Sequence, residues 1–126
     1  MSAVQRSVLV VDSDPEDLSS TVMLLEAAGY RVMSAAAFEE AKQMLASESP
    51  DLLITGLRLG CYNGLHLVLR SRVDHPEMVA IVTSDYHDPV LEAEAQRQHA
   101  GFLVRPLEAG DFVDVVARSF DSAVPS

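Results

Sequence analysis

Four sets of residues that could take part in chemistry come directly after apolar runs of the sequence. They are Asp12-Ser13-Asp14, Thr55-Gly56, Thr83-Ser84 and Arg105-Pro106. A carboxylate such as Asp12 can bind a cation, while a hydroxyl such as Thr83 and a cation such as Arg105 can bind an anion. Such groups can hold a metal ion or a charged ligand.

Five apolar runs alternate with five segments of helical periodicity. We predict strands over residues 8–11, 31–35, 52–55, 78–82 and 102–104. The predicted helices start after Asp14, at Phe38, after Asn63-Gly64, at Asp88-Pro89 and at Asp111. The first, second and last of these helices end at Gly29, Ala46 and Phe120. Continuous β-branched runs such as Val8–Val11 are typical of strands buried on both faces. This alternation predicts an α/β fold, with a parallel sheet between two layers of helices.

Local signals support several of these boundaries. Asp14 is a good N-cap, Pro15 suits the first helical position, and Gly29 suits the end of that helix. In the third helix, we expect Leu65, Val68 and Leu69 to face inward. Sites in parallel sheets lie beyond the carboxyl ends of the strands, so the four sets of residues are expected to meet there.

Length and composition narrow the classes of function. We predict a single domain of 126 residues with a core over about 7–120 and a tail or linker start at 121–126. The net charge of −10 argues against nucleic-acid binding, which needs clustered cations. The only cysteine, Cys61, allows no disulfide within the chain and suits a cytoplasmic location. The apolar run Val8–Val11 is too short for a signal peptide or a membrane span.

Five motifs occur in the order and at the spacing of a known family. They are Val8–Pro15, Pro50–Thr55, Asn63-Gly64, Val82–Ser84 and Val104–Leu107. Together they resemble the receiver domain of bacterial response regulators, from Val8 to Phe120. The resemblance implies a flavodoxin-like (βα)5 fold with strand order 2-1-3-4-5, and a cis peptide at Arg105-Pro106. It also places Phe102 at the family's aromatic switch position.

The chain departs from the family pattern at the residues that carry the chemistry. The resemblance implies a site at which an aspartate takes up a phosphoryl group with the help of Mg²⁺. It places this aspartate at Gly56, the second acidic residue at Ser13 and the family's lysine at Arg105. We therefore predict a degenerate phosphorylation pocket formed by Asp12, Ser13, Gly56, Thr83 and Arg105. In this pocket Asp12 pairs with Arg105, no residue is catalytic, and Mg²⁺ binding is weak or absent. We expect no other metal and no cofactor.

These departures predict a signalling module, not an enzyme, that works without phosphorylation in a two-component system. Its partner would be a histidine kinase, another regulator or a second copy of the chain, and neither nucleic acid nor membrane. We expect the interaction face to include Val90, Leu91, Leu107 and Asp111. Two alternatives stay open. The pocket could serve a small ligand or another covalent modification, or the chain could be the N-terminal regulatory part of a longer regulator with an output domain.

Overall fold

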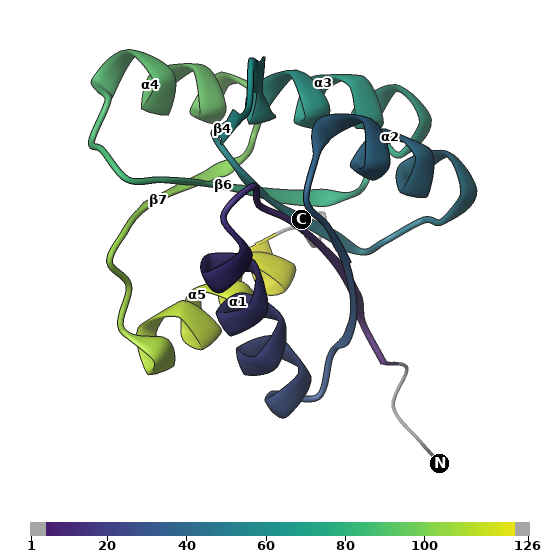
Figure 1. The fold of residues 1–126 in the computed structure, drawn as a ribbon, viewed down its shortest axis with the longest axis vertical. Coiled ribbons are helices and arrows are strands. Elements are labelled where there is room, and N and C mark those ends of the chain that lie inside the picture. The colour runs from purple at the N-terminus through teal and green to yellow at the C-terminus, as the bar shows by residue number, and fades with distance from the viewer. Residues whose placement is uncertain (1–4, 123–126) are drawn as a thin grey trace.

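A parallel sheet of five strands forms the centre of the computed structural model, which describes residues 5–122 (Figure 1). Its strands are β1 (Ser7–Val11), β2 (Arg31–Ala35), β3 (Leu52–Gly56), β6 (Val79–Ser84) and β7 (Gly101–Val104). Their spatial order is β2-β1-β3-β6-β7, and every neighbouring pair is parallel. The predicted flavodoxin-like fold and its order 2-1-3-4-5 are confirmed.

Two layers of helices cover the sheet (Figure 1). One layer contains α1 (Pro15–Ala27) and α5 (Ala109–Ser122), and the other contains α2 (Phe38–Ser47), α3 (Gly64–Asp74) and α4 (Pro89–Arg97). Successive strand residues point to opposite faces, so each strand contributes to two cores. Val10 and Ile54 pack with Phe112 beneath α1 and α5, whereas Leu9 and Leu53 belong to the core beneath α2, α3 and α4.

The predicted signals at the ends of α1 are confirmed. The carboxylate of Asp14 accepts hydrogen bonds from the backbone N–H groups of Glu16 and Asp17, so it caps the helix at the carboxyl end of β1. Gly29 follows α1 with a φ of +99°, a conformation that favours glycine. Asp88 caps α4 in the same way, through Val90 and Leu91.

Some boundaries differ from the prediction. Strand β6 begins at Val79, not Met78, and continues through Thr83 to Ser84, so these two residues belong to the strand. Helix α5 begins at Ala109 and ends at Ser122, which places Asp121 in the helix and not in a tail. The rest of the predicted tail, residues 123–126, lies outside the described residues. No helix among the residues 5–122 is both long and apolar enough to cross a membrane.

Two further features were not predicted correctly. Leu69 is 58% exposed, because the buried face of α3 passes through Leu67 and Ser71, and each residue turns the helix by about 100°. In addition, a hairpin of two short antiparallel strands, β4 (Arg58–Leu59) and β5 (Tyr62–Asn63), lies between β3 and α3, where we predicted no strand. The Tyr62 ring stacks on Phe38 of α2 with 4.6 Å between the ring centroids, which holds this hairpin against the domain.

Candidate functional site: a charged cluster at the carboxyl edge of the sheet

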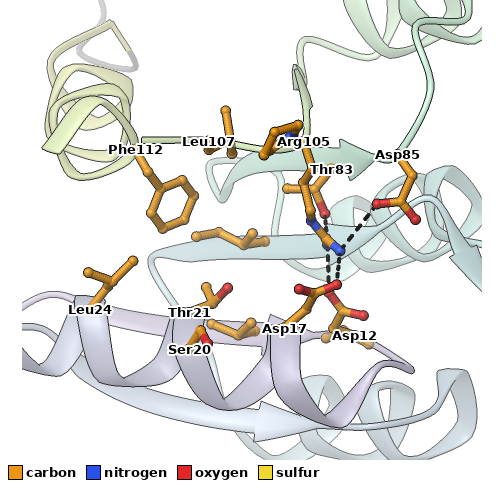
Figure 2. A pocket seen from close by; sticks show the side chains of 14 residues that line it. Asp12, Asp17, Ser20, Thr21, Leu24, Thr83, Asp85, Arg105, Leu107 and Phe112 are labelled. Atoms are coloured by element: carbon orange, nitrogen blue, oxygen red, sulfur yellow. Dashed lines mark hydrogen bonds and ion pairs between the residues drawn. The ribbon is translucent and has the colours of Figure 1, made fainter. Parts of the chain in front are cut away.

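The carboxyl ends of four strands bring the predicted site residues to one edge of the sheet. Asp12 follows β1, Gly56 ends β3, Thr83 lies near the end of β6, and Arg105 follows β7. Figure 2 shows Arg105 extending from its strand end toward Asp12 and Thr83. The peptide between Arg105 and Pro106 is cis, as the family resemblance implied.

Arg105 is the centre of the cluster. Its Nη2 donates to Asp12 Oδ2 at 2.6 Å and to Thr83 Oγ1 at 2.7 Å, and its Nη1 donates to Asp17 Oδ2 at 2.6 Å. Asp85 Oδ1 lies 3.7 Å from Nη1. The guanidinium therefore connects β1, α1 and β6 through charge-assisted hydrogen bonds, which are stronger than neutral ones. The ion pair predicted between Asp12 and Arg105 is present.

Asp12 is the buried member of the cluster, with only 7% of the residue exposed. Its Oδ1 accepts a hydrogen bond from the backbone N–H of Asp14 at 2.9 Å, while its Oδ2 faces Arg105. Both carboxylate oxygens are therefore engaged by donors. A buried carboxylate needs such partners, because an unpaired charge at this depth is costly.

Two members of the cluster were not among the predicted site residues. Asp17 lies in the first turn of α1, and Asp85 follows β6 in the turn before α4. Both lie at the same edge of the sheet as Asp12, and this position in the sequence could have identified them as candidate site residues. The sequence pattern does not show how far the Arg105 side chain reaches, so it could not identify these two carboxylates as partners.

Gly56 has room for a side chain. A Cβ atom added there would lie 3.8 Å from the Arg58 and Val11 carbonyl oxygens and 3.9 Å from Asp12 Cγ, which are ordinary contacts. By contrast, a Cβ at Gly64 would lie 2.1 Å from the Gly56 carbonyl oxygen. Close packing therefore requires glycine at 64 but not at 56. An aspartate at 56 would place its carboxylate beside Asp12.

Ser13 stands apart from the charged cluster. It is exposed, and its hydroxyl donates to the Arg58 carbonyl oxygen at 3.4 Å. The cluster itself contains three carboxylates and one guanidinium, a formal charge of −2. Within residues 5–122, no group of three or more His, Cys, Asp or Glu side chains has an arrangement suited to a metal ion.

These residues do not fit the magnesium ion that the family resemblance implies. Mg²⁺ requires oxygen ligands in nearly octahedral geometry and usually one or two carboxylates from the protein. Both oxygens of Asp12 already accept hydrogen bonds, Gly56 has no side chain, and the Ser13 hydroxyl is turned toward Arg58. Arg105 supplies positive charge at Asp12.

The remaining predicted residues lie on α4 and around β7. Val90 is 73% exposed on α4, whereas Leu91 is half-buried against the core. Leu107 is half-buried, Asp111 is exposed in the first turn of α5, and Phe102 is half-buried against the core beneath α2, α3 and α4. Their roles as an interaction face and as a switch, like the assignment of a degenerate pocket, stay predictions.

A cavity of about 440 Å³ opens beside the charged cluster, between α1 and the connection from β7 to α5. Asp12, Asp17, Thr83, Asp85 and Arg105 line one end. The other lining residues are Val10, Val11, Ser20, Thr21, Leu24, Ile54, Pro106, Leu107 and Phe112. In Figure 2, Leu24 from α1 and Phe112 from α5 lie on the side away from the charged residues. The sequence pattern gave no indication of this cavity.

Comparison with known proteins identifies one family. Residues 8–117 match the model of the response regulator receiver domain. The chain is 28% identical over 127 residues to the transcriptional regulatory protein GlrR of Escherichia coli K12; the match includes the whole chain but only 29% of GlrR. The chain therefore spans less than a third of that relative's length.

Solved structures of receiver domains have the same fold. A CheY-like receiver domain protein from Methanospirillum hungatei JF-1 superposes with a TM-score of 0.88 at 23% identity, over 95% of this chain and 97% of that one. The beryllofluoride-activated receiver domain dimer of NtrC4 has a TM-score of 0.87 at 22% identity, over 94% and 98% of the two chains. At these identities the structural likeness supports the fold alone.

Proposed function

Because this chain belongs to the response regulator receiver domain family of bacterial two-component systems, we propose that it is a receiver that signals without being phosphorylated. The observation that carries the proposal is Gly56 at the end of β3, the position at which the family resemblance places the acceptor aspartate. Glycine has no side chain, so no aspartyl phosphate can form there. The space around Gly56 supports this interpretation. A side chain would fit there, so packing does not explain why glycine replaces the aspartate.

The other carboxylates of the cluster do not replace the missing nucleophile. Asp12 and Asp17 each direct Oδ2 to Arg105 at 2.6 Å, and a carboxylate held by a guanidinium is a weaker nucleophile than a free one. Asp85 is 69% exposed and follows β6, not β3. Arg105 already lowers the negative charge of the cluster, so we propose that the site has little affinity for Mg²⁺.

A receiver of this kind acts through contacts with other proteins. We propose that its partner is a histidine kinase, another regulator or a second copy of the chain, and that the domain catalyses no reaction. The surface with Val90, Leu91, Leu107 and Asp111 is the candidate for this contact. Val90 and Asp111 are exposed, and Leu91 and Leu107 are half-buried. The transcriptional activity in the name of GlrR belongs to a protein more than three times as long.

The decisive experiment offers the domain a phosphoryl group directly. The purified protein is incubated with about 10 mM Mg²⁺ and a small phosphodonor, or with beryllofluoride, and followed by intact mass and by amide spectra. We expect no mass increase and no change at Asp12, Gly56 or Thr83. A stoichiometric phosphoryl adduct, or beryllofluoride shifts confined to these residues, would refute the proposal.

A series of variants tests how much of the pocket has been lost. Gly56→Asp restores the nucleophile. In this variant Arg105 still binds Asp12, and the uncharged Ser13 still stands at the second acidic position. We expect this variant to be phosphorylated poorly, and the triple variant that adds Ser13→Asp and Arg105→Lys to be phosphorylated faster. Equal rates for the single and triple variants would show that neither Ser13 nor Arg105 limits the chemistry.

A further inference from the structure

We propose that the cavity between α1 and the β7–α5 connection binds a small amphipathic amine, with its apolar part in the cavity and its ammonium group among the carboxylates. The cavity volume of about 440 Å³ lies within the range of small-molecule sites, roughly 300–1,000 Å³. Half of its fourteen lining residues are apolar, and the four charged ones lie together at one end. This proposal goes beyond signalling without phosphorylation and does not depend on it.

The apolar part of the cavity is formed by side chains from the sheet and from the helix layer of α1 and α5. Ile54 comes from β3. Leu24 comes from α1, Leu107 from the segment that leads into α5, and Phe112 from α5 itself (Figure 2). Ile54 and Phe112 are buried in the same core cluster, and Leu24 and Leu107 are partly buried against it. A hydrocarbon or aromatic group placed there would remove apolar surface from water, which favours binding.

The charged end of the cavity favours a cation. Asp12, Asp17 and Asp85 oppose a single guanidinium, which leaves a formal charge of −2 at the cavity mouth. Arg105 directs three hydrogen bonds at the acceptors around it, so most of its capacity to bind an anionic ligand is already used.

Asp17 and Asp85 are the carboxylates that could receive the ammonium group. Arg105 takes only Oδ2 of Asp17, and among residues 5–122 no side chain donates a hydrogen bond to Oδ1. Asp85 lies 3.7 Å from Arg105, beyond hydrogen-bond distance, and is 69% exposed. An ammonium group has three donors, and it would satisfy these two carboxylates together.

The test uses three probes with the same ring and different charge, namely 2-phenylethylamine, 2-phenylethanol and phenylacetate. Each is titrated into the ¹⁵N-labelled protein at neutral pH. We expect the amine to shift amide signals at Thr21, Leu24, Leu107 and Phe112 with a millimolar dissociation constant, roughly that of a fragment of its size. The alcohol and the acid should bind at least 10-fold more weakly.

Two pairs of variants locate the amine. Thr21→Phe fills the cavity and should abolish binding, while Ser19→Phe changes an exposed residue of the same helix that does not line the cavity and should not affect binding. Asp85→Asn should weaken amine binding by about 5-fold, whereas Asp114→Asn, an exposed carboxylate on α5, should not.

Three outcomes would overturn the proposal. They are equal binding of amine and alcohol, tighter binding of the acid, and binding that survives Thr21→Phe in a variant that still folds. All of them are measured without a phosphodonor, so they are distinguishable from a failure of the phosphorylation experiment. Methylammonium serves as a further probe, and binding as tight as that of phenylethylamine would show that the acidic residues act without the cavity.

Discussion

Replacing Arg105 by methionine tests whether this side chain takes the place of a metal ion. The substitution keeps an unbranched chain of similar length but removes the charge and the three hydrogen bonds to Asp12, Asp17 and Thr83. Asp12 then stays buried, with the backbone N–H of Asp14 as its remaining partner. The negative charge of the cluster rises from −2 to −3.

The expected loss of stability follows from the burial of each partner. Breaking a fully buried ion pair costs about 3–5 kcal/mol, because one charge is left uncompensated. Here the Asp12 side chain is 9% exposed but Arg105 is 21% exposed, which allows some hydration of the remaining carboxylate. The bond to Asp17, whose side chain is 43% exposed, adds at most about 1 kcal/mol. We therefore expect Arg105→Met to lower the free energy of unfolding by about 2–3 kcal/mol.

Urea denaturation measures this loss, with Arg97→Met as the matched control. Arg97 also pairs with a carboxylate, Glu94, but its side chain is 65% exposed, so its removal should cost less than about 0.5 kcal/mol. Adding Asp12→Asn to Arg105→Met should recover about 1–2 kcal/mol, because the buried carboxylate is then gone.

Magnesium provides the second readout. We expect about 10 mM Mg²⁺ to stabilise Arg105→Met by about 1 kcal/mol and to leave the unmodified protein unchanged. Equal losses in Arg105→Met and Arg97→Met would refute the assignment of Arg105 as the charge that balances Asp12. Mg²⁺ stabilisation of the unmodified protein would refute it as well.

Three further substitutions test the packing, two of them at the site and one near the C-terminal end of α3. Gly56→Ala should stabilise the protein by about 0.5–1 kcal/mol in urea denaturation, because the added Cβ meets only ordinary contacts and the unfolded chain loses conformational freedom. A loss of stability would show that glycine is required there. Gly64→Ala should cost about 3 kcal/mol or more, since its Cβ would collide with the Gly56 carbonyl oxygen, and a neutral effect would contradict this close approach. Arg72→Met should lower the free energy of unfolding by about 2–4 kcal/mol in the same assay, because three hydrogen bonds are lost. The Arg72 guanidinium donates to the carbonyl oxygens of Met78, Gln98 and His99, and its burial lowers its pKa. Full stability of this variant would mean that water replaces the guanidinium.

The fold was predictable because its three central strands, β1, β3 and β6, are buried on both faces. Such strands form continuous apolar runs, as in Val8–Val11, and these runs alternate with helices in a pattern that few topologies satisfy. The hairpin of β4 and β5 was not predictable in this way. Each of its strands has two residues, too few for any periodicity, and the stacking of Tyr62 on Phe38 joins residues that are far apart in the sequence.

The sequence predicted the site residues whose location depends on the backbone alone. It did not predict contacts that depend on the length and conformation of a side chain. Asp12, Thr83 and Arg105 were found because parallel strands end at one edge of the sheet. The contact of Arg105 with Asp17 depends on how α1 is rotated and on the conformation of a long side chain. The error at Leu69 has a similar origin, because a helix with leucines at several spacings can be rotated in more than one way.

Leu107 connects the proposed ligand site with the proposed interaction face. It lines the cavity, and it also belongs to the surface that we expect to contact a partner. An amine in the cavity would touch Leu107 and Phe112 and so bias the position of the segment that leads into α5. Such coupling is reciprocal, since a ligand that changes self-association by some factor must itself bind the associated form more tightly or more weakly by that factor. A receiver without an acceptor aspartate could respond to a signal in this way, because phosphorylation in a receiver also acts by shifting an existing equilibrium between conformations.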